Sequence, residues 1–137
     1  MPGSDVVQPP TQAEYLAVAR LREALRRFSA ESERITRVHG LTTQRYQLLL
    51  MIKAAREGSG RATQKELAAR LSLAQSSLTE LVHRAEDLRL IRRRLVAARR
   101  GEVAFELTAS GERRLRGAMV DLRGERSRLL SLLSSLE

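Results

Sequence analysis

The sequence predicts a mainly α-helical protein that carries one small β-hairpin, and three observations predict it. Apolar residues recur at steps of three and four over most of the 137 residues, as expected where one face of a helix is buried. This period changes to two between about residues 91 and 107, which is typical of a hairpin with one apolar face. Breaks at Gly40, Gly58–Gly60 and Ser72 divide the helical part into segments that can pack on one another.

The composition excludes several classes of protein. The absence of cysteine excludes disulfides, thiolate metal sites and thiol redox switches. No apolar run approaches about 18 residues, and the first ten residues lack a signal-peptide core, so we expect a cytoplasmic protein without a membrane partner. Two distant histidines and scattered carboxylates form no acid–base pair or metal constellation. We therefore predict that the protein is not an enzyme and has no cofactor.

The charge points to an anionic partner. The net charge is +9, and all but two of the 25 basic residues are arginine. Six arginines and no acid lie between Arg89 and Arg100. A run of this kind is either a solvated surface or a contact with a polyanion, with nucleic acid favoured over a membrane surface.

The first part of the chain predicts an arm and two helices. Residues 1–10 contain all three prolines and are expected to form a flexible arm. A long helix should follow over about residues 11–38, with Leu16, Leu21, Leu25 and Phe28 on one face. Thr42 or Thr43 can cap a second helix, which is apolar on most sides and should be central.

The middle of the chain predicts two short helices joined by a tight turn. Thr63 and Glu66 have the spacing of a capping box, which should start a helix over residues 64–71. After the break at Ser72, a further helix is expected from about residue 74 to residue 88. Its inward positions are Leu78, Leu81, Val82 and Ala85, and its opposite face is polar. Two such helices form a helix-turn-helix pattern.

The last part predicts the hairpin and one long helix. Ile91, Arg93 and Leu95 alternate with polar residues, and a second alternating run follows a turn at residues 97–101. Thr108 should cap a helix that reaches about Leu136. Its apolar seam alternates steps of four and three, is interrupted at residue 126 and favours a partner helix.

A helix-turn-helix followed by a basic hairpin is a winged helix, and this one resembles the MarR family of bacterial transcription regulators. The resemblance covers about residues 14–134, and no single motif is specific by itself. It rests on the order and spacing of His39-Gly40-Leu41-Thr42, Thr63-Gln64-Lys65-Glu66-Leu67-Ala68-Ala69-Arg70-Leu71, Leu81-Val82-His83-Arg84, Leu90-Ile91 with Arg93-Arg94, and Leu107-Thr108-Ala109-Ser110-Gly111.

The resemblance implies a domain plan and a function. It implies a single domain over residues 11–137, with a DNA-binding lobe at about residues 41–107 and dimerisation helices at about 11–38 and 108–136. The implied function is a homodimeric, sequence-specific transcription regulator, a ligand-responsive repressor on a pseudo-palindromic operator in double-stranded DNA. The implied effector is a small aromatic or phenolic anion, and the implied location is the bacterial cytoplasm, at the nucleoid when bound.

Carried onto this chain, the resemblance assigns DNA contacts to the second helix of the motif and to the hairpin. Short polar side chains near that helix's N-terminus suit base edges, and basic groups further on suit phosphate or the minor groove. The predicted DNA-binding residues are Gln75, Ser76, Ser77, Thr79, Glu80, His83 and Arg84 on the helix, and Arg92, Arg94, Arg99 and Arg100 on the hairpin.

The sequence departs from the family pattern at four places. Ala74 stands where the family has a capping Ser or Thr, and Arg89 stands where it has a glycine that often needs a positive φ. The hairpin tip lacks the family's Asp before Arg99 and Arg100. The residues after Leu133 resemble the start of the family's final helix, where this sequence stops.

Several of these residues have a local alternative. Ser76 and Ser77 can bond to nearby backbone, and Glu80 can pair with Arg84 one turn on. Arg93 can fold inward to an acid instead of contacting DNA. Two other functions also fit the sequence, namely a non-specific architectural DNA-binding protein and a helical protein-interaction module.

Overall fold

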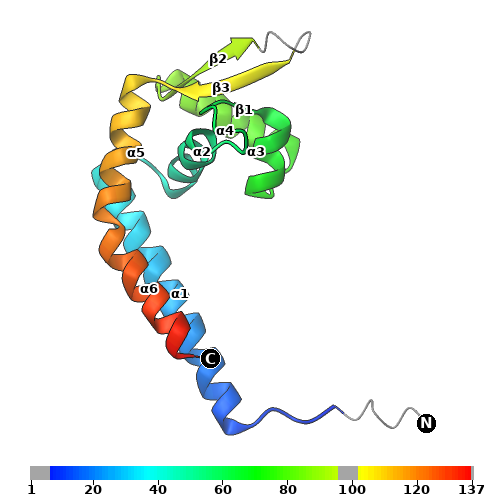
Figure 1. Cartoon of the computed structure of the whole chain (residues 1–137), viewed down its shortest axis with the longest axis vertical. Helices are drawn as coiled ribbons and strands as arrows, with labels where there is room; N and C mark the ends of the chain where they lie inside the picture. The colour runs from blue at the N-terminus through cyan, green and yellow to red at the C-terminus, as the bar shows by residue number, and fades with distance from the viewer. Residues whose placement is uncertain (1–6, 96–101, 137) are drawn as a thin grey trace, which may run out of the picture.

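The computed structural model describes residues 7–95 and 102–136 and confirms the predicted fold class of helices with a small β-hairpin. The elements follow the predicted order (Figure 1), and they are α1 (Gln12–Val38), α2 (Thr43–Lys53), β1 (Ala62–Thr63), α3 (Gln64–Leu71), α4 (Gln75–Asp87), β2 (Ile91–Leu95), β3 (Val103–Leu107), α5 (Ala109–Asp121) and α6 (Arg123–Ser135).

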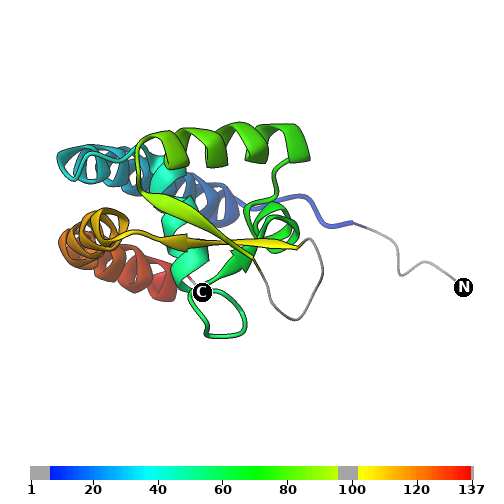
Figure 2. The same cartoon turned by 90° about the horizontal axis from the view of Figure 1, so that it is seen from above.

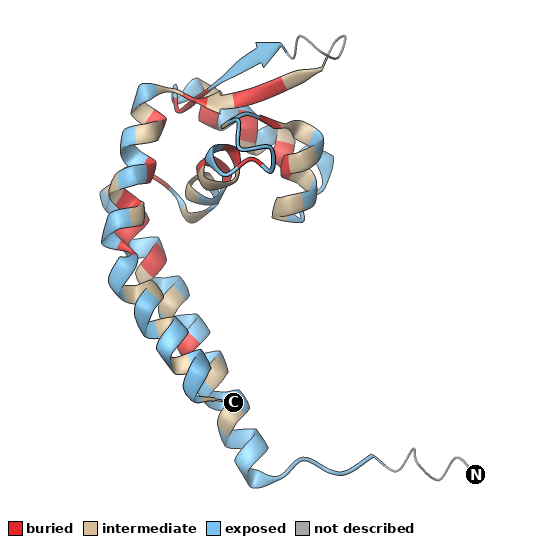
Figure 3. Ribbon diagram, viewed as in Figure 1, coloured by how far each residue is buried: buried red, intermediate tan, exposed pale blue. Residues whose placement is uncertain are grey.

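The molecule has a lobe and a stalk. Helices α2, α3 and α4 and the sheet form the lobe, while α1 and α6 lie side by side and extend away from it (Figures 1 and 2). Buried residues gather in the lobe, and most residues of the stalk are exposed (Figure 3). The lobe therefore has its own core, whereas the stalk offers a large helical surface.

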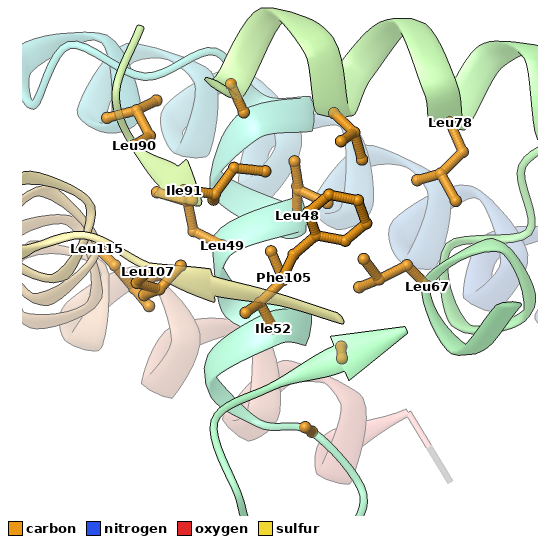
Figure 4. Close-up of a cluster of buried hydrophobic side chains, with 14 of the residues drawn as sticks. Leu48, Leu49, Ile52, Leu67, Leu78, Leu90, Ile91, Phe105, Leu107 and Leu115 are labelled. Carbon is orange, nitrogen blue, oxygen red and sulfur yellow. The ribbon is translucent and has the colours of Figure 1, made fainter. Parts of the chain in front are cut away.

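The core of the lobe is built around α2. Leu48, Leu49 and Ile52 are fully buried and meet Phe105 of β3 (Figure 4). Burial on several sides of α2 confirms its predicted central place. Leu78 of α4 closes the same cluster.

The sheet has three strands in the order β1-β3-β2, all antiparallel. The hairpin of β2 and β3 is confirmed, with Ile91 opposite Leu107 and Arg93 opposite Phe105. The sequence did not predict β1, which is too short for an alternating pattern. Its two residues pair with Phe105 and Ala104 on the other edge of β3.

Two local expectations were wrong. The last helix is divided at Leu122, which is buried, and the Arg126 guanidinium near this point donates to the carbonyl oxygen of Met119. The capping box at Thr63 is only half formed, because Thr63 accepts from the Glu66 backbone N–H but the Glu66 carboxylate turns elsewhere. That carboxylate accepts from the Arg56 backbone N–H and from Arg70.

Three helices end in the same way, with one residue in the left-handed region. The residues are Gly40 after α1, Ser72 after α3 and Arg89 after α4, with φ of 72°, 54° and 58°. After α4 the N–H groups of Arg89 and Leu90 bond to the carbonyls of Glu86 and Ala85, which is the Schellman pattern. The positive φ expected at Arg89 is confirmed.

Candidate nucleic-acid interface

Helix α4 divides the predicted residues cleanly between core and surface. Leu78, Val82 and Ala85 are buried against the lobe, as predicted. The opposite face therefore points to solvent. The structure leaves Thr79 half-buried and exposes the other predicted members, Gln75, Ser76, Ser77, Glu80, His83 and Arg84.

The N-terminus of α4 carries no side-chain cap. Ala74 is the N-cap residue and has extended backbone, and no side chain bonds to the first turn. Ser72 and Ser76 thus do not replace the missing cap. Free N–H groups at a helix N-terminus favour an anion, so the exposed face of α4 begins at a weakly positive end.

Gln64, at the start of α3, contacts two of the predicted residues. Its Nε2 lies 3.1 Å from Gln75 Oε1 and 2.9 Å from Thr79 Oγ1. The Thr79 hydroxyl in turn donates to the Gln75 carbonyl oxygen at 2.8 Å. Thr79 is therefore occupied inside the protein rather than free to donate to a base. No local pattern indicates this link, because Gln64 belongs to the preceding helix.

Two hollows lie along the exposed face of α4. One, of about 370 Å³, separates α4 from the start of α2, and Arg45 lines it together with Ser77, Glu80 and Arg84. The other, of about 380 Å³, is lined by Ser76, Thr79, Glu80, His83, Arg84 and Asp87. Among the contacts of the described residues, Glu80 and Arg84 form no ion pair, so the predicted local alternative for them is wrong. Arg45 was not a predicted site residue.

Three arginines surround one carboxylate on the outer face of the sheet. Glu106 faces away from the core because its neighbour Phe105 points inward. Arg92 stands opposite Glu106 on β2 and donates to it at 2.8 Å, Arg61 beside β1 donates at 3.2 Å, and Arg94 donates as well. We call these four residues the arginine cluster.

The arginine cluster holds its carboxylate ionised and keeps excess positive charge. The bond from Arg94 has the largest effect on the pKa of Glu106; burial opposes it, but the bonds from Arg92 and Arg61 add to it and the pKa falls to about 2. The Glu106 side chain is 13% exposed, whereas those of the arginines are 50% or more exposed. Three guanidinium groups on one carboxylate leave an exposed surface with a net positive charge.

Arg93 takes the inward alternative. Its guanidinium makes two bonds to the Glu86 carboxylate, at 2.9 and 3.1 Å, and lies 5.5 Å from the centre of the Phe105 ring. The bonds to Glu86 raise the pKa of Arg93 above its ordinary value. Arg93 thus ties β2 to the end of α4. The other two predicted hairpin residues, Arg99 and Arg100, lie outside the described residues.

Other kinds of site find no support in the part of the chain that the structure describes. No group of three or more histidines and carboxylates there is arranged to hold a metal ion. Within the same residues, no helix is long and apolar enough to cross a membrane. His39 bonds to Asp121 through Nε2 at 2.6 Å and joins the end of α1 to α5.

Comparisons with known proteins find the same family pattern and the same fold. A model of the MarR family matches residues 39–101, a range that includes α2 to β2. AbsC, a MarR family transcriptional regulator from Streptomyces coelicolor, shares the fold with a TM-score of 0.76 at 22% identity, over 93% of this chain and 84% of that chain.

The similar structures include complexes with DNA. The M. tuberculosis transcriptional regulator MOSR, solved with DNA, has a TM-score of 0.63 at 27% identity, over 80% of this chain and 77% of that chain. A mutant MarR from E. coli, complexed with operator DNA, has a TM-score of 0.68 at 17% identity, over 88% and 85%. A search of curated protein sequences gives no match.

Proposed function

The chain belongs to the MarR family of winged-helix transcription regulators, and from this premise we propose that it is a homodimer that binds a specific site in double-stranded DNA. The observation that carries the proposal is the exposed polar face of α4, which lies in the same lobe as the positively charged arginine cluster. In this arrangement α4 enters the major groove and the hairpin meets the phosphates beside it.

The chemistry of the two surfaces differs in the way that sequence recognition needs. Gln75 and Ser76, near the start of α4, are short enough to bring amide and hydroxyl groups to base edges. Arg84 lies further along the same face, where it would contact the phosphate backbone of the DNA. Arg92 and Arg94 carry charge that any duplex would attract. We therefore assign specificity to α4 and most of the affinity to the basic groups, including Arg99 and Arg100.

The stalk supports the proposed homodimer. Tyr15, Leu16 and Val18 of α1 and Leu130 of α6 are each more than half exposed. Large apolar residues in such numbers on a helical pair favour burial against another surface. A second copy of the chain would cover them and set two α4 helices on successive major grooves, about 34–36 Å apart.

We further propose that a small aromatic or phenolic anion acts as effector and that the protein represses transcription. A cavity of about 290 Å³ between α1 and α6 is lined by Phe28 and by Arg27 and Arg128, together with Ala24, Glu125, Leu129 and Leu132. The aromatic ring of the effector can pack on Phe28 while a guanidinium group donates hydrogen bonds to its anionic group. Because the cavity lies in the stalk, an occupant can alter the angle between the two lobes of a dimer.

Selection from a pool of random duplexes tests the proposal. We expect a pseudo-palindrome to be enriched, with a preference above about tenfold over random duplex at physiological salt, and a steep fall of log K with log salt. Gln75→Ala should relax the preference at one base pair, while Arg99→Ala should weaken binding to all sequences alike. Binding without an enriched motif would indicate an architectural protein, and no binding at low salt would indicate a protein-interaction module.

Dimerisation and effector response are tested separately. Light scattering should give the mass of two chains. Addition of a phenolic carboxylate should weaken operator binding in the wild type and leave it unchanged in Phe28→Ala, with thermal unfolding as a check that the variant is folded. An equal response of both proteins would contradict the proposed effector cavity.

A further inference from the structure

The contact between Gln64 and α4 fixes the orientation of three polar groups. The Thr79 hydroxyl has one hydrogen, and it is directed to the Gln75 carbonyl oxygen at 2.8 Å. Thr79 Oγ1 can therefore only accept the bond from Gln64. The Gln64 atom at 2.9 Å from it must be the amide nitrogen, because the amide oxygen has no hydrogen to donate.

The orientation of Gln75 follows from that of Gln64. The second hydrogen of Gln64 Nε2 is directed to the Gln75 side chain at 3.1 Å, so the Gln75 atom at that place must be the acceptor Oε1. The Gln75 amide is thus held with its oxygen towards α3. Its own Nε2, with two hydrogens, makes no hydrogen bond to any described residue and lies on an exposed side chain.

We propose that Gln64 is a positioning residue for base recognition, which makes Gln75 present N–H donors to the DNA. The inference rests on the proposed function, because it requires α4 to read a major groove. A free glutamine can turn its amide over and offer either donor or acceptor. With its orientation held, Gln75 suits a base with an acceptor edge, such as guanine, adenine N7 or thymine O4. Cytosine is disfavoured, because its major-groove edge offers only the N4 donor.

The inference predicts a reversal of base preference when the polarity at position 64 is reversed. In Gln64→Glu the introduced carboxylate can only accept, so the Gln75 amide must turn over to donate to it and direct its oxygen outward. In Gln64→Lys the ammonium group can still donate to Gln75 and Thr79, so the orientation of Gln75 is kept. These two variants change the charge at residue 64 in opposite directions. Their overall affinities for DNA therefore show how much of any change is due to charge alone.

The experiment is duplex-pool selection with the wild type and the variants. The position that loses its preference in Gln75→Ala identifies the base pair that Gln75 reads. At that position we expect wild type and Gln64→Lys to exclude cytosine, Gln64→Ala to lose about fivefold or more of the preference, and Gln64→Glu to favour cytosine or adenine. Preferences at the other positions should not change, and binding to a random duplex measures the effect of charge separately.

Three outcomes would overturn the inference. If Gln64→Ala lowers the melting temperature but keeps the wild-type motif, Gln64 only stabilises the turn between α3 and α4. If Gln64→Glu and Gln64→Lys select the same base, the amide of Gln75 is not oriented by residue 64. In both cases the proposed DNA binding stands. If the wild type itself enriches no motif, the proposed function fails and the inference fails with it.

Discussion

Replacement of Glu106 by glutamine tests whether one carboxylate holds the outer face of the sheet together. Arg61, Arg92 and Arg94 all donate to Glu106, which is mostly buried beneath them. Glutamine has nearly the same shape but no charge. Its amide nitrogen is a hydrogen-bond donor, as the guanidinium groups are, so it cannot accept a bond from them. The variant Glu106→Gln therefore leaves three positive groups close together without a counter-charge.

The magnitude follows from the pKa of Glu106. A fall from an ordinary value of 4.5 to about 2 corresponds to about 3 kcal/mol for an unscreened pair. Because the guanidinium groups are at least half exposed, water screens them. We therefore expect Glu106→Gln to lower the free energy of unfolding by about 1–2 kcal/mol.

The same values give the pH dependence. The folded-state pKa of Glu106 lies below that of the unfolded chain, so the unfolded chain binds more protons between about pH 5 and pH 2. The stabilisation is therefore complete above about pH 5 and is lost as the pH falls through about 2. The wild type and Glu106→Gln should differ at pH 7 and converge towards pH 2.

Urea unfolding at pH 7, 4 and 2 measures this difference. Glu112→Gln is the matched control, because Glu112 makes a single, more exposed ion pair with Lys53 at 2.7 Å. The control should lose less than about 1 kcal/mol. A difference between wild type and Glu106→Gln that stays constant over this pH range would refute the reasoning, since it would not come from the ionised carboxylate. At pH 7 the added positive charge should also strengthen binding to random duplex.

Four further substitutions have defined expectations, each checked by urea unfolding unless stated. Arg89→Gly should raise the free energy of unfolding by about 1 kcal/mol, because it removes the Cβ from a residue in the left-handed region. Arg89→Ala should not raise it, and equal effects of the two substitutions would contradict this explanation. Ala74→Ser should add about 1 kcal/mol by capping α4, and no gain would mean that the N-terminus is already satisfied. Gly111→Ala should cost about 2 kcal/mol or more, because its Cβ would lie 2.1 Å from the backbone oxygen of Leu90, and a neutral result would contradict this packing. Leu130→Asp should halve the mass found by light scattering without unfolding the chain, and an unchanged dimer would exclude this face of α6 from the interface.

The features that could be predicted from the sequence are those that repeat along the chain. Leu78, Val82 and Ala85 recur with the helical period, so both the buried and the exposed face of α4 followed from them. The hairpin followed from a change of period, and the positive φ at Arg89 from the glycine that the MarR family has at this place after a helix. In each case the physical cause acts over a few neighbouring residues.

The features that could not be predicted depend on residues that only the fold brings together. Arg61 is 45 positions from Glu106, and it reaches that carboxylate because β1 adds a third strand to the hairpin. Gln64 meets α4 across the turn of the helix-turn-helix motif. Glu66 has the spacing of a capping box, but a half-buried guanidinium from Arg70 competes for its carboxylate. A local pattern cannot show which distant partner will win such a competition.

The arginine content itself has two uses, and only one of them concerns DNA. Arg70 donates to two carbonyl oxygens at the end of α2, Arg114 to two at the end of α1, and Arg126 to one at the end of α5. A guanidinium group suits this task because it carries several donors in a fixed plane, whereas a lysine offers a single point of charge. These arginines stabilise helix ends and lie apart from the exposed face of α4. The net charge of +9 therefore overstates the charge that the proposed DNA-binding face presents, and part of the excess lies in the arginine cluster. Substituting Arg114 should consequently lower stability with little change in the salt dependence of DNA binding, whereas substituting Arg94 should reduce that salt dependence.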